Sequence, residues 1–442
     1  MRRILITCVL LEMIILTAGG QTVWTLEDCV NYALEHNIDL ARQSHAIERE
    51  DIAVQEGKWA FAPQFSASSS YTMSTGRVLD PTTYDFVKTK YTGNGTSSVS
   101  GDITIFEGGR KFFALNRAKL SLKIATQQNE SLLHNLKIRI AGAYMELLCA
   151  RENKRIAEET VQLICHQLER TQAMYDAGSV TETDVLQLRT QLSAARKDAS
   201  SAAYSLRLAK LSLCDLLEVD DFESFEVAEP EEFTASLAGW DREAVLESQP
   251  EIRSSALKKD LAGIDYKLAV SAMSPKLSLS AGYGTSYSDA RRKTMMNEDG
   301  TIRYEAYPFF EQYADNGSAF VSLSLSIPIL NGMTTRNGIK RARIAQMESR
   351  LDEQETRRRL RKQLIQAETD YESALEDYLH GQKELEYARD AFALVENKYN
   401  LGVADFLSWN TAAVELAKAK YGLSEAKYTY ILRAKIMEFY LN

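Results

Sequence analysis

The residue types that most often carry catalysis or metal binding are scattered along this chain. Its histidines are His36, His45, His134, His166 and His380. No two of them are four residues apart, and none lies at zinc-site spacing from a cysteine. Neither the GxxxxGK[ST] pattern of a phosphate-binding loop nor the GxSxG pattern of a hydrolase nucleophile occurs. The sequence therefore predicts no catalytic residue, no bound cofactor, no metal site and no ATPase engine on this chain.

The carboxylates are densest at 218–233, where EVDDFESFEVAEPEEF holds eight acidic residues and no basic one. We interpret this segment as a solvated linker. A Ca²⁺ site is the alternative, but an ordered 12-residue ligand loop with its glycine is absent. Elsewhere, charged helix faces account for the acidic residues without acid–base roles. The net charge of −9 argues against nucleic-acid binding.

The first 20 residues resemble a secretory signal. Arg2 and Arg3 precede an apolar run that is too short to span a bilayer, and small residues follow it up to Gly20. Removal of residues 1–20 leaves four cysteines in an exported chain. These are Cys29, Cys149, Cys165 and Cys214. We predict that they are packing residues, with a Cys29–Cys214 disulfide as the alternative.

The chain contains the same unit twice. Pro63 and Pro275 lie 212 residues apart, whereas Gly178 and Gly402 lie 224 apart, as do Gly108 and Gly332. The difference between the two offsets indicates a 12-residue insertion between Pro275 and Gly332. Two copies make a duplicated unit and not a solenoid.

Each copy contains a long helical pattern. From Leu133 to Tyr175 the apolar residues alternate steps of three and four, which is the seam of a coiled coil, and the same alternation recurs from Arg357 to Tyr399. The pattern resumes on a second helix in each copy. The tips YDAGSV and YNLGVA between them predict turns, with Gly178 and Gly402 as left-handed caps.

Two segments, about 62–107 and 275–329, change to a period of two. Apolar residues such as Phe65, Val99, Leu279 and Leu323 alternate with serines. One explanation is a half-buried sheet, and the other is a set of outer-membrane strands with a water-filled lumen on the serine side. Four strands cannot close a barrel around water, so the second explanation requires several chains. The connections at about 75–96 and 289–317 are predicted as long exposed loops.

These patterns predict a mostly helical chain with membrane strands. After the signal, 1–20, the first repeat covers 21–217, the acidic linker 218–240 and the second repeat 241–442. Each repeat has a first helix, a β-hairpin, a long helix, a tip and a last helix. The long helices are expected at about 109–174 and 333–398, each roughly 100 Å long, and the last helices at about 181–217 and 405–440.

The order of these elements, the run IPILNG at 327–332, the shorter FEGG at 106–109 and the paired tips resemble the outer membrane efflux proteins of the TolC family. The resemblance covers about 21–442. It implies a homotrimer that spans the outer membrane with a 12-stranded β-barrel, extends into the periplasm as an α-barrel, and contacts outer-membrane lipid. It also implies a passive duct for efflux or type I secretion that docks a periplasmic adaptor (membrane fusion) protein and is powered by an inner-membrane pump of the RND, ABC or MFS type.

The resemblance assigns roles to residues at the tips. The docking positions that match are Gly178, Ser179, Val180, Gly402, Val403 and Ala404. Some relatives gate the tunnel with acidic residues and an arginine, but the matching positions here are Ser408, Thr411 and Ala404. Asp184 or Asp405, tripled by symmetry, could form a carboxylate ring that favours cations. The alternative is that each carboxylate stabilises a helix start.

Two other function classes remain open at this point. A periplasmic coiled-coil scaffold with a small soluble sheet would need no detergent for extraction. A surface enzyme has no supporting group of residues. The sequence names neither the transported substrate nor the pump.

Overall fold

The computed structural model describes residues 23–79, 86–230 and 240–441. The predicted signal segment, 1–20, lies outside these residues. The chain forms two compact units. The first is made of the described parts of Met1–Ala46, Ala125–Ser255 and Glu353–Asn442, and the second of those of Ile47–Ile124 and Ala256–Asp352. Each unit takes segments from both copies of the repeat, so the copies are not separate compact bodies.

The first helix expected in each copy is in fact two helices. In the first copy, α2 (Leu26–His36) is followed by α3 (Ile38–Trp59); in the second, α6 (Arg242–Ser248) is followed by α7 (Pro250–Ser271). The breaks fall at Asn37 and Gln249, which are 212 residues apart and have extended backbones. The Asn37 Oδ1 accepts the N–H of Asp39 at 3.0 Å, so a side-chain cap explains the first break.

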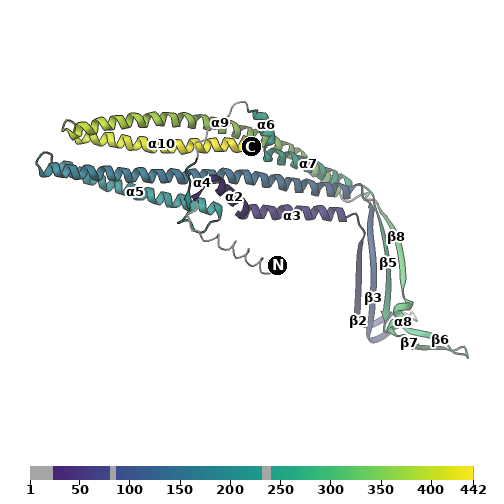
Figure 1. Ribbon diagram of the computed structural model, residues 1–442. Coiled ribbons are helices and arrows are strands. Elements are labelled where there is room, and N and C mark those ends of the chain that lie inside the picture. The colour runs from purple at the N-terminus through teal and green to yellow at the C-terminus, as the bar shows by residue number, and fades with distance from the viewer. Residues whose placement is uncertain (1–22, 80–85, 231–239, 442) are drawn as a thin grey trace, which may run out of the picture. The chain divides into compact units, whose positions relative to one another are not determined.

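The long helices form two antiparallel hairpins (Figure 1), and the paired parts of these helices belong to the first unit. One hairpin pairs α4 (Arg110–Asp176) with α5 (Glu182–Leu217), and the other pairs α9 (Thr334–Asn400) with α10 (Phe406–Leu441). Both α4 and α9 have 67 residues, close to the expected bounds. α10 also contacts the first hairpin, where Lys420 Nζ lies 2.9 Å from the Glu159 carboxylate on α4.

The largest core of the first unit surrounds the middle of α4. Buried Tyr144 donates its hydroxyl proton toward two backbone oxygens, those of Trp24 at 3.1 Å and Ala228 at 2.8 Å. Trp24 is the last residue of β1 (Val23–Trp24), and Ala228 directly follows β4 (Glu226–Val227), the strand that pairs with β1 in parallel. Cys29 and Cys214 are buried free thiols in this core. They are packing residues, as predicted.

The acidic segment between the copies is not simply a solvated linker. Phe225 and Val227 are buried in the main core. The Glu229 carboxylate lies 2.5 Å from Arg151 on α4 and accepts a bond of 3.3 Å from the Tyr428 hydroxyl on α10. The apolar residues Phe225 and Val227 pack the segment against the core. Its carboxylates lie near basic side chains, as Glu229 does near Arg151. Residues 231–239 lie outside the described part of the chain.

The second unit contains a four-stranded antiparallel sheet in the order β2-β3-β5-β8. The strands are β2 (Gln64–Leu79), β3 (Phe86–Phe106), β5 (Lys276–Ser288) and β8 (Ser318–Ser326). Ala67 lies opposite Val99, which lies opposite Tyr283 in turn. Because directly opposed residues share a face, the apolar residues gather on one face and the serines on the other, as the alternation predicted.

The predicted first loop, about 75–96, is wrong. β2 and β3 stay paired as far as Leu79 and Phe86, with a register shift between Ser74 and Gly76. Gly93 lies inside β3. A Cβ at this position would stand 2.0 Å from the Tyr71 hydroxyl. Close approach of an aromatic ring, and not a turn, explains that glycine.

The second connection, expected as a loop over about 289–317, has its own structure. It holds a small hairpin, β6 (Arg292–Met296) and β7 (Ile302–Ala306), followed by the short helix α8 (Phe309–Asp315). The 12 extra residues predicted for the second copy fall in the interval that contains these elements. Among the described helices of both units, none has the length and apolar character needed to cross a bilayer.

His134 occupies an unfavourable place for a charged side chain. It lies on α4 beside the ring of Tyr440, with 5.0 Å between ring centroids. Its buried Nε2 has no hydrogen-bond partner within the described residues. Burial, with a smaller contribution from Lys137, lowers the pKa of His134 below its ordinary value of 6.5. The folded state therefore favours the neutral ring.

We predict a stability loss in mild acid that depends on His134. Below about pH 6.5 the unfolded chain takes up a proton that the folded chain resists. The free energy of unfolding should therefore be highest above that pH and should fall as the pH drops toward the folded pKa. His134→Phe should reduce this decline, measured as the melting temperature at several pH values. His380→Phe, at an exposed position, is the control, and an equal decline in both variants would refute the assignment.

Candidate docking tips and the neighbouring cavity

The first tip follows the end of α4 at Asp176. Gly178 has φ 75°, and its N–H donates to the Tyr175 carbonyl at 2.8 Å. The Ser179 N–H donates to the Met174 carbonyl at 2.9 Å. These two bonds form a Schellman motif, which satisfies carbonyls that the helix end would leave open. The left-handed cap predicted at Gly178 is confirmed.

The second tip repeats this geometry 224 residues later. Gly402 has φ 72°, its N–H donates to the Tyr399 carbonyl at 3.0 Å, and the Val403 N–H donates to Lys398 at 2.9 Å. The two tips therefore have the same Schellman motif. Arg170 of α4 donates a bond of 3.4 Å to the Asn400 carbonyl, which joins the first hairpin to the end of α9.

The six predicted docking residues lie at these turns, but the two tips differ in character. Gly178, Ser179, Gly402 and Val403 are exposed, and Val180 and Ala404 are half-buried. At the second tip Leu401, Val403 and Leu407 are 79%, 75% and 68% exposed. The turn of the first tip presents glycine and serine instead. The second tip thus offers an apolar surface to a partner, and the first offers a polar one.

An aromatic cluster supports the tips from inside the unit. Trp409 is fully buried, with its ring centroid 6.1 Å from Tyr399 and 6.2 Å from both Phe392 and Phe406. Ile164 and Leu188 of the first hairpin belong to the same core. The helical pattern predicted the helix that carries Trp409, but it did not reveal that this one ring packs against both hairpins below the tips.

The candidate constriction carboxylates have local partners. The Asp184 carboxylate accepts the Thr181 hydroxyl at 2.8 Å and the Thr181 N–H at 3.0 Å. The Asp405 carboxylate accepts the Ser408 N–H at 2.9 Å. Hydrogen bonding from the Ser408 side chain, and secondly from its backbone, lowers the pKa of Asp405 below its ordinary value. Both carboxylates cap helix starts. A carboxylate ring formed by several copies stays a prediction.

The positions that match the gate of some relatives hold no ion pair within the described residues. The Thr411 hydroxyl donates to the Leu407 carbonyl at 2.9 Å, and Ser408 serves the Asp405 cap through its backbone. Both interactions are internal to α10 and its start. The gate of acidic residues and an arginine found in some relatives therefore has no charged equivalent at these positions.

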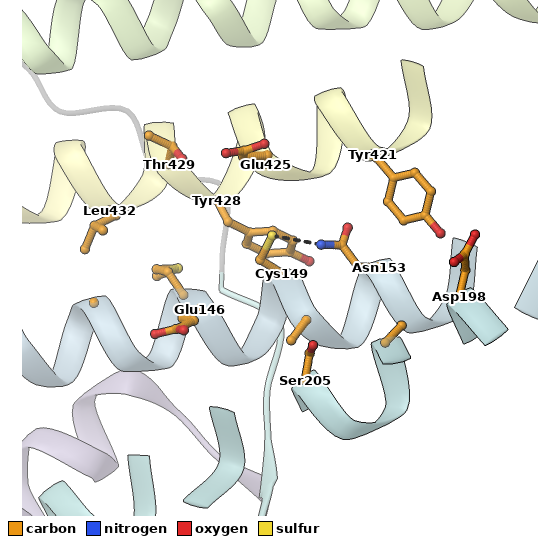
Figure 2. A pocket seen from close by; sticks show the side chains of 14 residues that line it. Glu146, Cys149, Asn153, Asp198, Ser205, Tyr421, Glu425, Tyr428, Thr429 and Leu432 are labelled. Carbon is orange, nitrogen blue, oxygen red and sulfur yellow. Dashed lines mark hydrogen bonds between the residues drawn. The ribbon is translucent and has the colours of Figure 1, made fainter. Parts of the chain in front are cut away.

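A cavity of about 700 Å³ lies between α4, α5 and α10, farther along the hairpins. Figure 2 shows polar side chains from all three helices around it, with Tyr421 pointing toward Asp198. Its charged lining residues are Glu146, Asp198 and Glu425, and no basic residue lines it. Periodicity placed these residues on helices, but only the packing of the two hairpins brings them together.

The thiol in this cavity is poorly suited to chemistry. Cys149 Sγ accepts a bond of 3.6 Å from Asn153 Nδ2, drawn in Figure 2. Burial raises the pKa of Cys149, so the thiol stays protonated and is a weak nucleophile. Burial also raises the pKa of Cys29 to about 12 and that of Cys214 to about 11. Across the described ranges, no group of three histidine, cysteine or acidic side chains could hold a metal ion.

Comparison with known proteins gives consistent matches. Residues 29–217 and 242–435 match a family model described as "Outer membrane efflux protein". Outer membrane protein TolC of Vibrio cholerae is 22% identical over 419 residues, which cover 93% of this chain and 90% of that protein. The pyoverdine export outer membrane protein OpmQ of Pseudomonas aeruginosa is 26% identical over 332 residues, covering 73% of this chain and 63% of that protein.

Solved structures share the fold. VceC of Vibrio cholerae superposes with a TM-score of 0.79 at 16% identity, covering 94% of this chain and 95% of that one. The outer-membrane channel OprN gives a TM-score of 0.79 at 18% identity, covering 94% and 89% of the two chains. At these identities the likeness establishes the fold alone.

We predict that the left-handed backbone, and not crowding, makes Gly402 necessary. A Cβ at Gly402 would meet no atom within 4 Å. Gly402→Val should cost about 1–2 kcal/mol because a branched side chain resists positive φ, whereas Gly402→Asn should cost less. Faster hydrogen exchange of the Val403 amide in the valine variant would show the weakened turn. Equal exchange in both variants would contradict this explanation.

Proposed function

Because the chain belongs to the outer membrane efflux protein family, we propose that it is the passive exit duct of its tripartite system, assembled as a homotrimer. The protein is an outer-membrane efflux channel and not an enzyme. In the proposal, each copy gives four strands to a shared 12-stranded barrel, and its helices continue as a periplasmic tunnel. Energy comes from an inner-membrane pump, coupled through an adaptor that docks on the tips.

The observation that carries the proposal is the four-stranded sheet. Its apolar face is exposed to the surroundings, and its outer strands, β2 and β8, have no partner beyond them among the described strands. Open strand edges are unstable in lipid because no water satisfies their backbone groups. Pairing of β2 with β8 of a neighbouring copy removes the edges. Three copies supply the 12 strands that the family resemblance implies.

Two exposed apolar stripes support contacts between copies of the helical part. On α5, Tyr204, Leu208 and Leu211 follow helical spacing and are exposed. On α9, Tyr387 and Leu394 are exposed one heptad apart. Stripes on different helices suit a head-to-tail interface, which closes into a ring under threefold symmetry. The contact would remove this apolar surface from water.

The tips are the proposed adaptor surface. The side chains of Leu401 and Val403 are exposed, while the Schellman bonds and the Trp409 cluster support the turns. Apolar side chains on a preorganised turn lose little conformational entropy on binding. We therefore assign most of the docking energy to Leu401 and Val403. The transported cargo is a small toxic molecule or a secreted polypeptide, and the two differ in the pump they require.

We predict that charge on the apolar face of β8 blocks membrane insertion. Leu323→Arg should cost about 2–4 kcal/mol if this residue faces the middle of the bilayer. Outer-membrane fractions should then lose the protein, while purified protein keeps its helical circular dichroism. Ser322→Arg, on the opposite face of the same strand, is the control and should insert normally. Equal insertion of both variants would refute the membrane barrel.

A second prediction concerns the tip. Val403→Asp should weaken adaptor binding because a carboxylate replaces an exposed apolar contact, whereas Val403→Ile should preserve it. The measurement is recovery of the periplasmic adaptor with the channel after crosslinking, normalised to the amount of channel in the outer membrane. Unchanged recovery with the aspartate variant would remove Val403 from the docking surface.

A further inference from the structure

The short helix α8 lies on the apolar face of the sheet. Ser97 on β3 pairs with Thr285 on β5, and both share a face with Val99 because alternate residues of a strand point the same way. The Thr285 hydroxyl donates to the Tyr313 carbonyl at 2.8 Å. The Ser97 hydroxyl lies 3.0 Å from the Tyr313 hydroxyl. Two side chains of the apolar face thus hold α8 against it. Figure 1 shows α8 beside the end of β5.

Further contacts fix the helix in this position. The Tyr287 ring, on the same face, lies 5.0 Å from the Phe309 ring, which stacks on Tyr313 at 4.3 Å. Gln312 is buried and exchanges two bonds of 3.0 Å with the Ser288 backbone. The side-chain amide of Asn316 donates to the Ser286 carbonyl at 2.7 Å. These polar and aromatic contacts fix the orientation of α8 and therefore the direction in which its other side faces.

That free side exposes a large aromatic residue. Phe310 is 84% exposed, and its ring meets Phe309 edge to face at 5.3 Å. Charged groups flank the helix, since Glu311 pairs with Lys293 at 3.0 Å and the Tyr307 hydroxyl donates to Asp315. An apolar ring between paired charges suits a boundary where hydrocarbon meets polar groups.

We propose that α8 is an interfacial anchor that inserts Phe310 into the boundary between acyl chains and headgroups of the outer leaflet. The proposal rests on the membrane barrel proposed above. Lipid is the occupant because the face that carries α8 is the same face whose apolar band, including Val99, Tyr283 and Val321, would contact lipid. Ser97 and Thr285 interrupt this band with hydroxyl groups, Tyr71 and Tyr287 follow on the same face, and α8 lies at that level.

The experiment measures the depth of residue 310 with tryptophan fluorescence. Phe310→Trp is reconstituted into phosphatidylcholine vesicles whose acyl chains carry bromine either near the headgroups or near the bilayer centre. Emission is compared with that of the parent protein, which keeps its four native tryptophans. We expect the added emission to be quenched, more strongly by the shallow bromine. Phe310 is exposed, so the substitution should leave the packing of α8 intact.

Two matched variants on β8 separate failure of the anchor from failure of the barrel. Leu323→Trp reports the apolar face, and Phe320→Trp reports the opposite face of the same strand. Quenching at 323 but not at 320 or 310 would overturn the anchor and leave the barrel standing. Absence of quenching at both 323 and 310 would overturn the barrel and the anchor together. An unquenched, blue-shifted residue 310 would mean that protein, such as a neighbouring copy, covers it instead of lipid.

Discussion

The packing of α4 along its whole apolar seam is the interaction on which the rest of the structure depends. Most of the stability of a helix in a protein comes from tertiary packing and not from helix propensity. This packing must extend along a helix of 67 residues. Leu136, Ile140 and Tyr144 contribute to the main core, and Ile164 contributes to the core below the tips. The same seam therefore positions α5, the short strands and α10, and through them both tips.

The two copies of the repeat share one helical core, and the acidic segment between them packs on that core. Tyr144 holds the backbone on both sides of the β1–β4 pair, while Glu229 connects α4 with α10. The exposed ion pairs contribute little individually, so burial of Phe225 and Val227 supplies most of the attachment. A chain of two similar halves thereby forms one shared helical core in place of two.

The surfaces left exposed by this core differ in the partner that each requires. A sheet face with alternating apolar residues and open edges requires lipid and neighbouring strands, because backbone groups at an edge need hydrogen bonds. Helical stripes such as Tyr204, Leu208 and Leu211 are exposed, and in the proposed trimer they pack on a helix of another copy. The capped tips require neither for their own stability, which leaves their side chains available to a separate protein.

The sequence by itself determined the elements whose causes are local. A seam with steps of three and four predicted the bounds of α4 and α9 closely, and the glycine in each tip predicted a left-handed cap, because both depend on neighbouring residues in one chain segment. The tertiary structure alone decided the burial of Phe225 in a segment read as solvated, and the strand position of Gly93, which depends on the ring of Tyr71 on another strand. It also decided that α8 lies on the apolar face, since Ser97 and Thr285 hold Tyr313 only after the strands have paired. These outcomes depend on contacts between residues far apart in the chain, which no local pattern of residue types specifies.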